Sequence, residues 1–504
     1  MAQLSVTTMH QTFEAAEAAP GIAQSDVRAV NAKASRPLYA RREPIYPKRA
    51  AGKFRRIKWA VMAVTLGIYY LLPWLRWDRG PNLPDQAFLL DFAHQRLYLF
   101  GVEIWAQELY FVTGLLILSA LALFLVTAVA GRVWCGYTCP QTVWTDLMIA
   151  VEHFWQGDRN ARMRLAKAPW TLDKIWKISA THLSWILVGV ATGGAFVFYF
   201  RDAPTLAREF INFDAPAIAY LFLGIFTATT YVLGGLAREQ VCTYMCPWPR
   251  IQGAMFDADS LLITYRGYRG EPRGAHKKGE SWLGRGDCID CKQCVAVCPM
   301  GIDIREGAQL ECIQCALCID ACDEIMDKVG RPRKLIAYDT FRNLEAESHG
   351  DRAPIRLIRP RTILYASVLA LVGVIMLFGL SAKTVLDVNV QADRNPLFVT
   401  LSDGSIRNSY TVRILNKLYQ THSYGLSLEH LPQAKLAILG MEAEPTPRID
   451  VTSDNVRTLK VFVTLPRESA RALAASEIPF AIVVRDLTDG TQTKRDTIFR
   501  GPGK

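Results

Sequence analysis

Residues 288–299 read CIDCKQCVAVCP and residues 312–322 read CIQCALCIDAC, so the spacing C-x2-C-x2-C-x3-C occurs twice in close succession. A [4Fe–4S] cluster is held by four thiolates, and in two-cluster ferredoxins the fourth Cys of each run ligates the other cluster. We therefore expect two [4Fe–4S] clusters as cofactors, the first held by Cys288, Cys291, Cys294 and Cys322, and the second by Cys312, Cys315, Cys318 and Cys298. Zinc sites are usually built from two separated C-x2-C pairs, so two identical quartets of cysteines fit a zinc site poorly.

The other four cysteines form two C-x3-C-P motifs. Residues 131–144 read GRVWCGYTCPQTVW and hold Cys135 and Cys139, and residues 238–257 read REQVCTYMCPWPRIQGAMFD and hold Cys242 and Cys246. If the chain stays helical there, the two cysteines of each pair share one helix face. We expect these four thiols to carry the catalytic chemistry.

Three interpretations of these pairs remain open. Four soft thiolates select Cu(I), zinc or iron–sulfur, and we favour a copper site, with Met148, Met245 and Met255 as nearby thioethers. A dithiol–disulfide relay is the second interpretation. Structural cysteines that cap helices are the third.

Composition indicates a membrane protein. Of 504 residues half are hydrophobic, 21% are charged and the mean hydropathy is positive, which excludes a disordered chain and argues against a purely cytosolic one. Five apolar stretches are long enough to span a bilayer: Trp59–Leu75, Leu109–Ala130, Ile178–Phe200, Ala217–Leu236 and Ile363–Leu380. Lys and Arg gather before the first span, in the second loop and in region 238–361, so the positive-inside rule places these segments in the cytoplasm.

The pattern changes again beyond the fifth span. Runs such as TLKVFVTL and FAIVVRDL alternate apolar and polar residues between turn sequences, which predicts an antiparallel β-sandwich on the outer side of the membrane. We expect a multi-domain membrane protein: 1–56, a mobile basic cytoplasmic tail; 57–258, an α-helical transmembrane bundle with both C-x3-C-P motifs; 259–345, a cytoplasmic ferredoxin-like α+β domain; 346–382, the fifth span with its flanks; and 383–504, an all-β sandwich.

Several functions are excluded by what the sequence lacks. Only His182 lies inside a span, which argues against a bis-histidine haem, and neither a P-loop nor a dinucleotide fingerprint occurs. The basic stretch 266–278 lacks the aromatic platform of a nucleic-acid reader, so we expect it to face lipid headgroups and expect no nucleic-acid partner.

These motifs together resemble the FixG/RdxA/CcoG family of membrane polyferredoxins, over nearly all the chain after residue 36. The resemblance is carried by VWCGYTCPQTVW, CTYMCPWPRIQGAMFD, the double ferredoxin run and SDGSIRNSYTVRILNK at 402–417. It implies a bacterial inner-membrane protein with two cytoplasmic clusters and a periplasmic Ig-like domain. It also implies a role in assembling cbb3-type cytochrome c oxidase, by reducing Cu(II) to Cu(I), with the oxidase assembly machinery and copper-handling proteins as partners.

The expected function is therefore that of an oxidoreductase, a cupric reductase fed by an unidentified cytoplasmic electron donor. Two alternatives belong to other classes. One is a non-enzymatic scaffold for oxidase assembly, and the other is a quinol-linked membrane electron-transfer ferredoxin. The C-x3-C-P pairs also resemble those of membrane ferredoxins in nitrate and nitrous-oxide respiration, so the pairs alone do not identify the partner.

Overall fold

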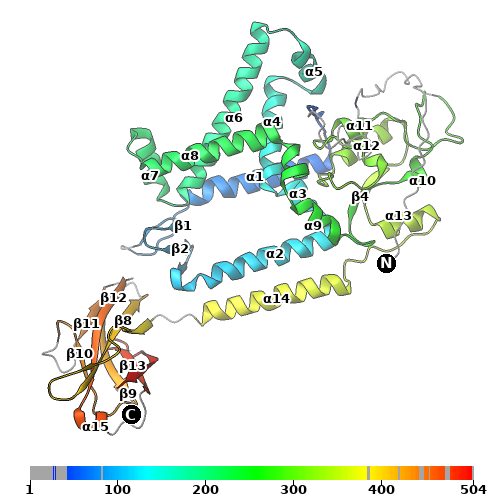
Figure 1. Cartoon of the computed structure of the whole chain (residues 1–504). Coiled ribbons are helices and arrows are strands. Elements are labelled where there is room, and N and C mark those ends of the chain that lie inside the picture. Colours follow the sequence, from blue (N-terminus) through cyan, green and yellow to red (C-terminus); the bar gives the residue numbers. More distant parts are fainter. Residues whose placement is uncertain are drawn as a thin grey trace. The chain divides into compact units, whose positions relative to one another are not determined.

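The computed structural model describes residues 27, 29, 43–80, 83–277, 279–382, 386–417, 420–441, 448–452, 455–471 and 477–501. Most of the predicted tail, residues 1–26, 28 and 30–42, lies outside the described residues, as do residues 383–385 at the predicted start of the outer domain. The chain forms two compact units. The first holds the long helices and the cysteine-rich domain, and the second holds the C-terminal strands (Figure 1).

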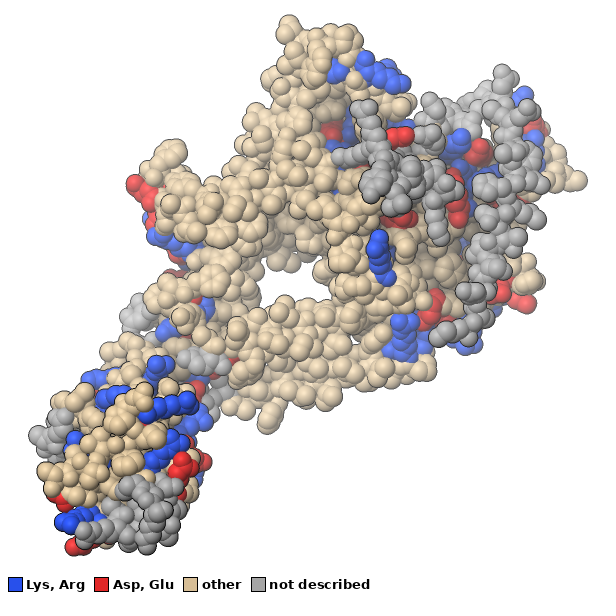
Figure 2. Space-filling view, viewed as in Figure 1, with Lys and Arg blue, Asp and Glu red and all other residues tan. Residues whose placement is uncertain are grey.

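Within the described residues, five helices are long and apolar enough to cross a membrane: α1 (Lys53–Leu71) with η2 (Leu72–Trp74), α2 (Tyr110–Ala130), α6 (Leu172–Phe198), α8 (Ala217–Thr229) with the π-helical η4 (Thr230–Ala237), and α14 (Pro360–Ser381). Their number and positions agree with the predicted spans. Figure 2 shows few charged side chains along these helices in that view. Helices α2 and α14 lie side by side, with the rings of Phe124 and Tyr365 6.5 Å apart (Figure 1).

Helix α1 begins earlier than its apolar stretch predicts, at Lys53 rather than Trp59. The reason lies far along the chain, because the carboxylate of Asp320 accepts hydrogen bonds from the backbone N–H groups of Phe54 (3.1 Å) and Arg55 (2.7 Å). A carboxylate at a helix N-terminus satisfies free N–H groups and complements the helix dipole. The cysteine-rich domain therefore caps the first membrane helix.

A small sheet that the sequence did not predict lies at the opposite end of the helices. Strands β1 (Phe88–Asp91), β2 (Arg96–Leu99) and β3 (Val102–Trp105) pair antiparallel, followed by η3 (Ala106–Glu108), and α7 (Ala203–Asn212) is close by. The buried amide of Gln86 joins these parts, since its nitrogen donates to Phe198 O (2.7 Å) and its oxygen accepts from Ala203 N (2.9 Å). The strands are only four residues each, too short for a clear alternation.

Shorter helices connect the spans at the cysteine-rich end: α3 (Val133–Tyr137), α4 (Pro140–Trp155), α5 (Arg159–Lys167), the π-helical η5 (Val241–Met245) and α9 (Trp248–Met255). Helix α4 carries two buried carboxylates. Asp146 accepts from Arg55 at 2.8 Å, and Glu152 pairs with both Arg162 and Arg238. Removing one partner from such a buried pair costs about 3–5 kcal/mol, so α4 holds the basic ends of several helices together.

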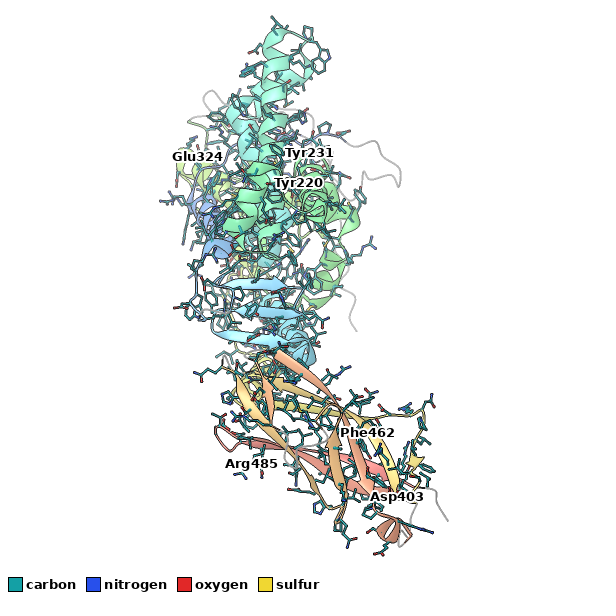
Figure 3. All side chains as sticks on the ribbon, turned by 90° about the vertical axis from the view of Figure 1, so that its left-hand side faces the viewer. Tyr220, Tyr231, Glu324, Asp403, Phe462 and Arg485 are labelled. Atoms are coloured by element: carbon teal, nitrogen blue, oxygen red, sulfur yellow. The ribbon has the colours of Figure 1, made fainter. Side chains whose placement is uncertain are left out.

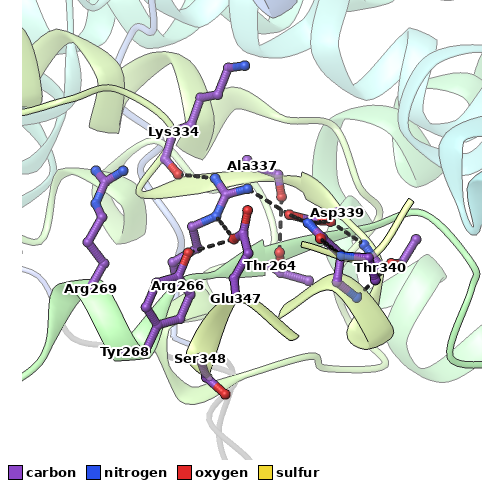
Figure 4. A network of polar contacts seen from close by, with 12 residues as sticks. Thr264, Arg266, Tyr268, Arg269, Lys334, Ala337, Asp339, Thr340, Glu347 and Ser348 are labelled. Carbon is purple, nitrogen blue, oxygen red and sulfur yellow. Dashed lines mark hydrogen bonds and ion pairs between the residues drawn. The ribbon is translucent and has the colours of Figure 1, made fainter. Parts of the chain in front are cut away.

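The cysteine-rich domain consists of β4 (Leu262–Tyr265), α10 (Gly267–Gly270), α11 (Gln293–Ala296), η6 (Ile304–Glu306), α12 (Leu317–Lys328), β5 (Ile336–Asp339) and α13 (Phe341–Ser348). Strands β4 and β5 pair antiparallel and join its two ends. Figure 4 shows how Arg266 closes this ribbon: its guanidinium binds Asp339 at 2.6 Å and Glu347 at 2.8 Å.

Residues 43–52 are packed rather than free, so the prediction of a mobile tail is wrong for this part of it. Lys48 donates from its backbone N–H to Ala296 O (2.8 Å) and from Nζ to Gln293 Oε1 (2.9 Å). Pro47 is buried, and its carbonyl lies 3.0 Å from Nε2 of His153. This segment therefore lines α4 and the first cysteine run.

The second unit is the predicted all-β sandwich. One sheet has the order β10 (Lys435–Ile438), β12 (Asn455–Leu465), β8 (Ile406–Asn416), β6 (Leu386–Ala392), with β7 (Val399–Thr400) on β8. The other has the order β11 (Ile449–Val451), β9 (His422–Glu429), β13 (Glu477–Asp486), β14 (Gln492–Arg500), and α15 (Arg467–Arg471) is a short connection. Tyr410, Val412 and Ile414 alternate into the core. Phe462 of β12, labelled in Figure 3, is only partly buried. The guanidinium carbon of Arg407 lies 5.4 Å from the centre of its ring.

Candidate metal centre

The first quartet lines one pocket. Cys288, Cys291 and Cys294 come from the loop before and into α11, and Cys322 comes from α12. The pKa of the Cys322 thiol is raised by burial and by the neighbouring Cys288 and Cys291. The structure thus brings together the four residues that the sequence assigned to the first cluster, including the one from the other run.

The second quartet likewise combines three cysteines of one run with the fourth cysteine of the other run. The pKa of the Cys318 thiol is raised by burial, then by Cys315, Cys312 and Cys298, and last by Cys294 of the first quartet, so the three other thiols assigned to the second cluster act on it most strongly. Burial also raises the pKa of Cys298 to about 12 and that of Cys312 to about 11. Without metal these buried thiols stay protonated, and a cationic iron core would supply the charge that favours the thiolates. Four sulfurs around one site fit the donor set of a [4Fe–4S] cluster.

Both cysteine loops use the same backbone device. Asp290 and Lys292 have φ of 48° and 53°, and the corresponding Gln314 and Ala316 have φ of 57° and 63°. These are left-handed conformations that cost a non-glycine residue about 1–2 kcal/mol each. The residues with positive φ stand at the same positions relative to the cysteines in both runs. Both loops therefore bend in the same way, which directs three thiols toward one point.

A buried arginine lies beside the first quartet. Arg305 has Nη1 4.0 Å from Cys288 Sγ, and it is neutralised by Asp303 (2.7 Å) and Asp290 (2.5 Å). Charges and hydrogen bonds next to cluster sulfurs set the reduction potential. Arg305 was not predicted from the sequence, because its contact depends on the fold of η6 and on no local motif.

The four remaining cysteines also lie together. The pKa of Cys242 is raised to about 12 by burial first, then by Cys139, Cys135 and Cys246, and lowered somewhat by Arg132. The pKa of Cys135 is raised by burial, against the opposing effect of Arg132. Cys135 is buried and Cys246 is exposed. These thiols form a single group, which we call the membrane-edge cysteines.

The two motifs adopt matching backbones and so form an internal structural repeat. Helix α2 ends at Gly131 with φ 57° and ψ −123°, and η4 ends at Arg238 with φ 48° and ψ −115°. A turn of helix follows each break and holds the first cysteine of the pair.

The second cysteine of each pair is not helical, which corrects the expectation of one shared helix face. Cys139 has φ −57° and ψ 127°, and Cys246 has φ −81° and ψ 122°. Both precede a proline, which disfavours the α-helical conformation of the residue before it. The kink before α4 and before α9, and not helical periodicity, brings the thiols together.

Several residues around the membrane-edge cysteines were not predicted. The Cys135 thiol donates to Oε1 of the buried Gln252 (3.2 Å), whose Nε2 donates to Thr127 Oγ1 (3.1 Å). Met300 is buried in the same apolar cluster as Cys135 and borders the small pocket beside Cys242. Of the methionines named from sequence, Met148 is buried in α4 and Met245 is exposed.

The membrane-edge cysteines pack directly on the loop of the second quartet. A Cβ placed on Gly136 would lie 2.6 Å from Ile313 O and 3.0 Å from Cys315 N, so only glycine fits there. The buried Tyr137 hydroxyl donates to Cys315 O at 3.2 Å. No comparable contact joins the membrane-edge cysteines to the first quartet in the described part of the chain.

Three known protein families match parts of this chain that correspond to the domains described above. The 4Fe-4S dicluster domain family matches residues 237–341, a 4Fe-4S binding domain family matches residues 112–156, and the Ig-like fold at the C-terminus of FixG matches residues 376–502. The nitrogen fixation protein FixG of Rhizobium meliloti is 51% identical, covering 96% of this chain and 97% of the relative. Protein RdxB of Cereibacter sphaeroides is 52% identical over 92% of this chain and 98% of its own length, and RdxA of the same organism is 50% identical over 88% and 93%.

The identity extends over almost the full length of these relatives, and the matched domains contain all twelve cysteines. The five apolar helices add the membrane component. The chain therefore belongs to the FixG/RdxA family and is a 4Fe-4S membrane electron-transfer protein of the FixG type.

Proposed function

We propose that this protein is a cupric reductase, in which electrons reach a copper ion at the membrane-edge cysteines. The observation that carries the proposal is the packing of α3 on the loop of the second quartet, where Gly136 lies against the backbone of Ile313 and Cys315. Two bound clusters would supply one-electron transfer at this place. The oxidoreductase interpretation thus rests on contact between a cluster loop and a group of soft ligands.

The copper chemistry follows from the ligands present. Cu(II) is the substrate, and one electron converts it to Cu(I). Thiolates of Cys135, Cys139, Cys242 and Cys246, with the thioether of Met300 close by, favour the softer Cu(I) over harder ions. Reduction and binding therefore favour each other.

The two cysteine pairs fit different tasks in this reaction. Cys135 is buried against the second quartet, and Cys246 is exposed. We infer that Cys135 faces the source of electrons and that Cys246 receives the ion. This assignment makes Cys246 the point where copper enters and leaves.

The proposed orientation uses the charge pattern. The basic ends of the helices lie together with the cysteine-rich domain, so this end faces the cytoplasm of the bacterial inner membrane. Five spans then carry the Ig-like sandwich into the periplasm. We propose that an unidentified cytoplasmic protein donates the electrons, and that Cu(I) passes to copper-handling proteins for assembly of cbb3-type cytochrome c oxidase.

The test begins with anaerobically purified full-length protein, for which we expect about eight iron atoms and eight acid-labile sulfides per chain. Cu(II) added to the reduced protein should reoxidise the clusters, seen as recovery of visible absorbance, with Cu(I) trapped by a chelator. The double variant Cys242→Ser, Cys246→Ser should lose this reaction while keeping its iron. Thr243→Ser, between the two cysteines, is the matched control and should react normally.

Two outcomes would overturn the proposal. Unchanged copper reduction in the double variant would remove the membrane-edge cysteines from the reaction. Clusters that Cu(II) never reoxidises would favour an assembly scaffold, and reoxidation by a quinone instead would favour a quinol-linked ferredoxin.

A further inference from the structure

We propose that the buried cation of Arg132 makes the second cluster the more easily reduced of the two and so directs electrons toward the membrane-edge cysteines. Arg132 acts as a positioning residue through its charge and its contacts. The direction of electron flow rests on the proposed function, but the ordering of the two potentials does not.

Arg132 connects the membrane helices to the second cluster loop. It follows the break at Gly131, and its backbone N–H donates to Gln314 Oε1 at 2.8 Å. Its Nη1 donates to Cys312 O at 3.0 Å and also to Leu310 O. The guanidinium thus holds the backbone of a cluster ligand, although the residue itself belongs to the first C-x3-C-P motif.

The charge of Arg132 has no carboxylate partner among the described residues. The side chain is 2% exposed, its guanidinium contacts carbonyl groups, and its Nε makes no hydrogen bond within the described part of the chain. A buried cation is costly without an opposing charge. The nearest candidates for that charge are thiolates, since Arg132 interacts electrostatically with Cys135, Cys242 and Cys312. Four thiolates outweigh the positive core of a cubane, so a loaded second cluster is an anion that fits this cation.

The first cluster has an arginine whose charge is cancelled. Arg305 lies between Asp303 and Asp290, both within ion-pair distance. Asp323 also acts on Cys322, so acidic groups outnumber the cation there. Around the second cluster, Glu311 acts on Cys312 against Arg132 and leaves the local charges balanced.

The consequence is an electrostatic gradient between the two clusters. Adding an electron to a cluster increases its negative charge, which a nearby net positive field favours and a net negative field opposes. The second cluster therefore has the higher reduction potential. Since this cluster adjoins the membrane-edge cysteines, the gradient points toward them.

The experiment is an anaerobic redox titration of the full-length protein, followed by EPR, with no copper present. We expect two one-electron steps. Arg132→Gln should lower the higher-potential step and leave the lower step in place, with a change of tenfold or more in the equilibrium between the clusters, or about 59 mV. Arg132→Lys should restore most of the wild-type value, and Arg164→Gln, which removes an exposed cation of α5, should change neither step.

Two further variants keep the test valid if Arg132→Gln loses iron. Glu311→Gln should raise the higher step, and Asp290→Asn should raise the lower step. The proposal is overturned if Arg132→Gln with full iron leaves the higher step unchanged or moves the lower one, or if Glu311→Gln moves the lower step. Because no copper is used, such a result would leave copper reduction itself standing, and failure of copper reduction would leave the potentials unaffected.

Discussion

Replacing Gly136 by alanine should loosen the contact between the membrane-edge cysteines and the second cluster loop. The added methyl group would lie 2.6 Å from Ile313 O and 3.0 Å from Cys315 N, whereas ordinary contact begins at 3.4 Å. Both obstacles are backbone atoms, which cannot rotate away as a side chain would. Helix α3 and the loop must therefore separate by about 0.8 Å at the closest point.

The energetic effect is the balance of two terms. Overpacking of this kind costs about 1–3 kcal/mol, and alanine returns up to about 1 kcal/mol because it favours helix more than glycine does. The separation also lengthens the bond from Tyr137 to Cys315 O, which is already 3.2 Å, beyond the range in which it is strong. We expect a net loss of about 1–2 kcal/mol at this contact.

Hydrogen–deuterium exchange of the loaded protein in detergent measures the effect locally. In Gly136→Ala the peptides covering 133–137 and 312–318 should exchange about 5- to 30-fold faster, which corresponds to that free energy. Gly67→Ala is the matched control, because a Cβ on Gly67 meets nothing within 4 Å. Equal exchange in the two variants would refute the reasoning, since it would show that the loop and α3 are not in tight contact.

Three further outcomes are expected. Asp320→Ala removes the cap of α1 and should cost about 0.5–2 kcal/mol, seen as faster amide exchange in the first turn of α1, whereas Glu324→Ala on the exposed face of α12 should have little effect. Arg266→Ala removes the cation paired with the buried carboxylate of Asp339, which keeps hydrogen bonds from Thr340 and Asn343 but no longer has an opposing charge from Arg266. It should lower stability by about 3–5 kcal/mol, measured as an earlier loss of cluster absorbance on heating. Burial lowers the pKa of His153, so the folded state resists protonation of this side chain. The free energy of unfolding therefore falls as the pH drops below about 6.5. Residues 43–52, which contact His153 through Pro47, should become more sensitive to protease in mild acid, and His153→Gln should remove this pH dependence.

Patterns within short stretches of sequence were sufficient to predict the cysteine-rich domain, the membrane helices and the sandwich. The spacing of the cysteines predicted which four line one pocket, Cys288, Cys291, Cys294 and Cys322, and the length of the apolar stretches predicted five helices. Alternation predicted the sandwich because its strands are long, with eleven residues in β8. In each case a single stretch of chain contains the signal.

Contacts between distant segments were beyond sequence reasoning. Asp320 caps α1 across 266 residues, and Arg132 reaches Cys312 across 180. Nothing next to these residues in the chain marks them as partners. The prolines after Cys139 and Cys246 were the one available signal that the motif is kinked, and helical periodicity was the wrong assumption there.

The repeat and its asymmetry together explain how one backbone design can serve two roles. Gly131 and Arg238 end their helices in nearly the same conformation, with positive φ and strongly negative ψ, which is easy for glycine and costs about 1–3 kcal/mol for arginine. Arg238 is held there because its Nε donates to Gly235 O at 2.6 Å and its guanidinium pairs with the buried Glu152. The arginine of the first motif, Arg132, lies one residue beyond the break; it has no carboxylate ion-pair partner among the described residues and contacts the cluster loop instead. Because the guanidinium is ion-paired in one half and contacts backbone carbonyls of a cluster loop in the other, matching backbones present two different electrostatic environments.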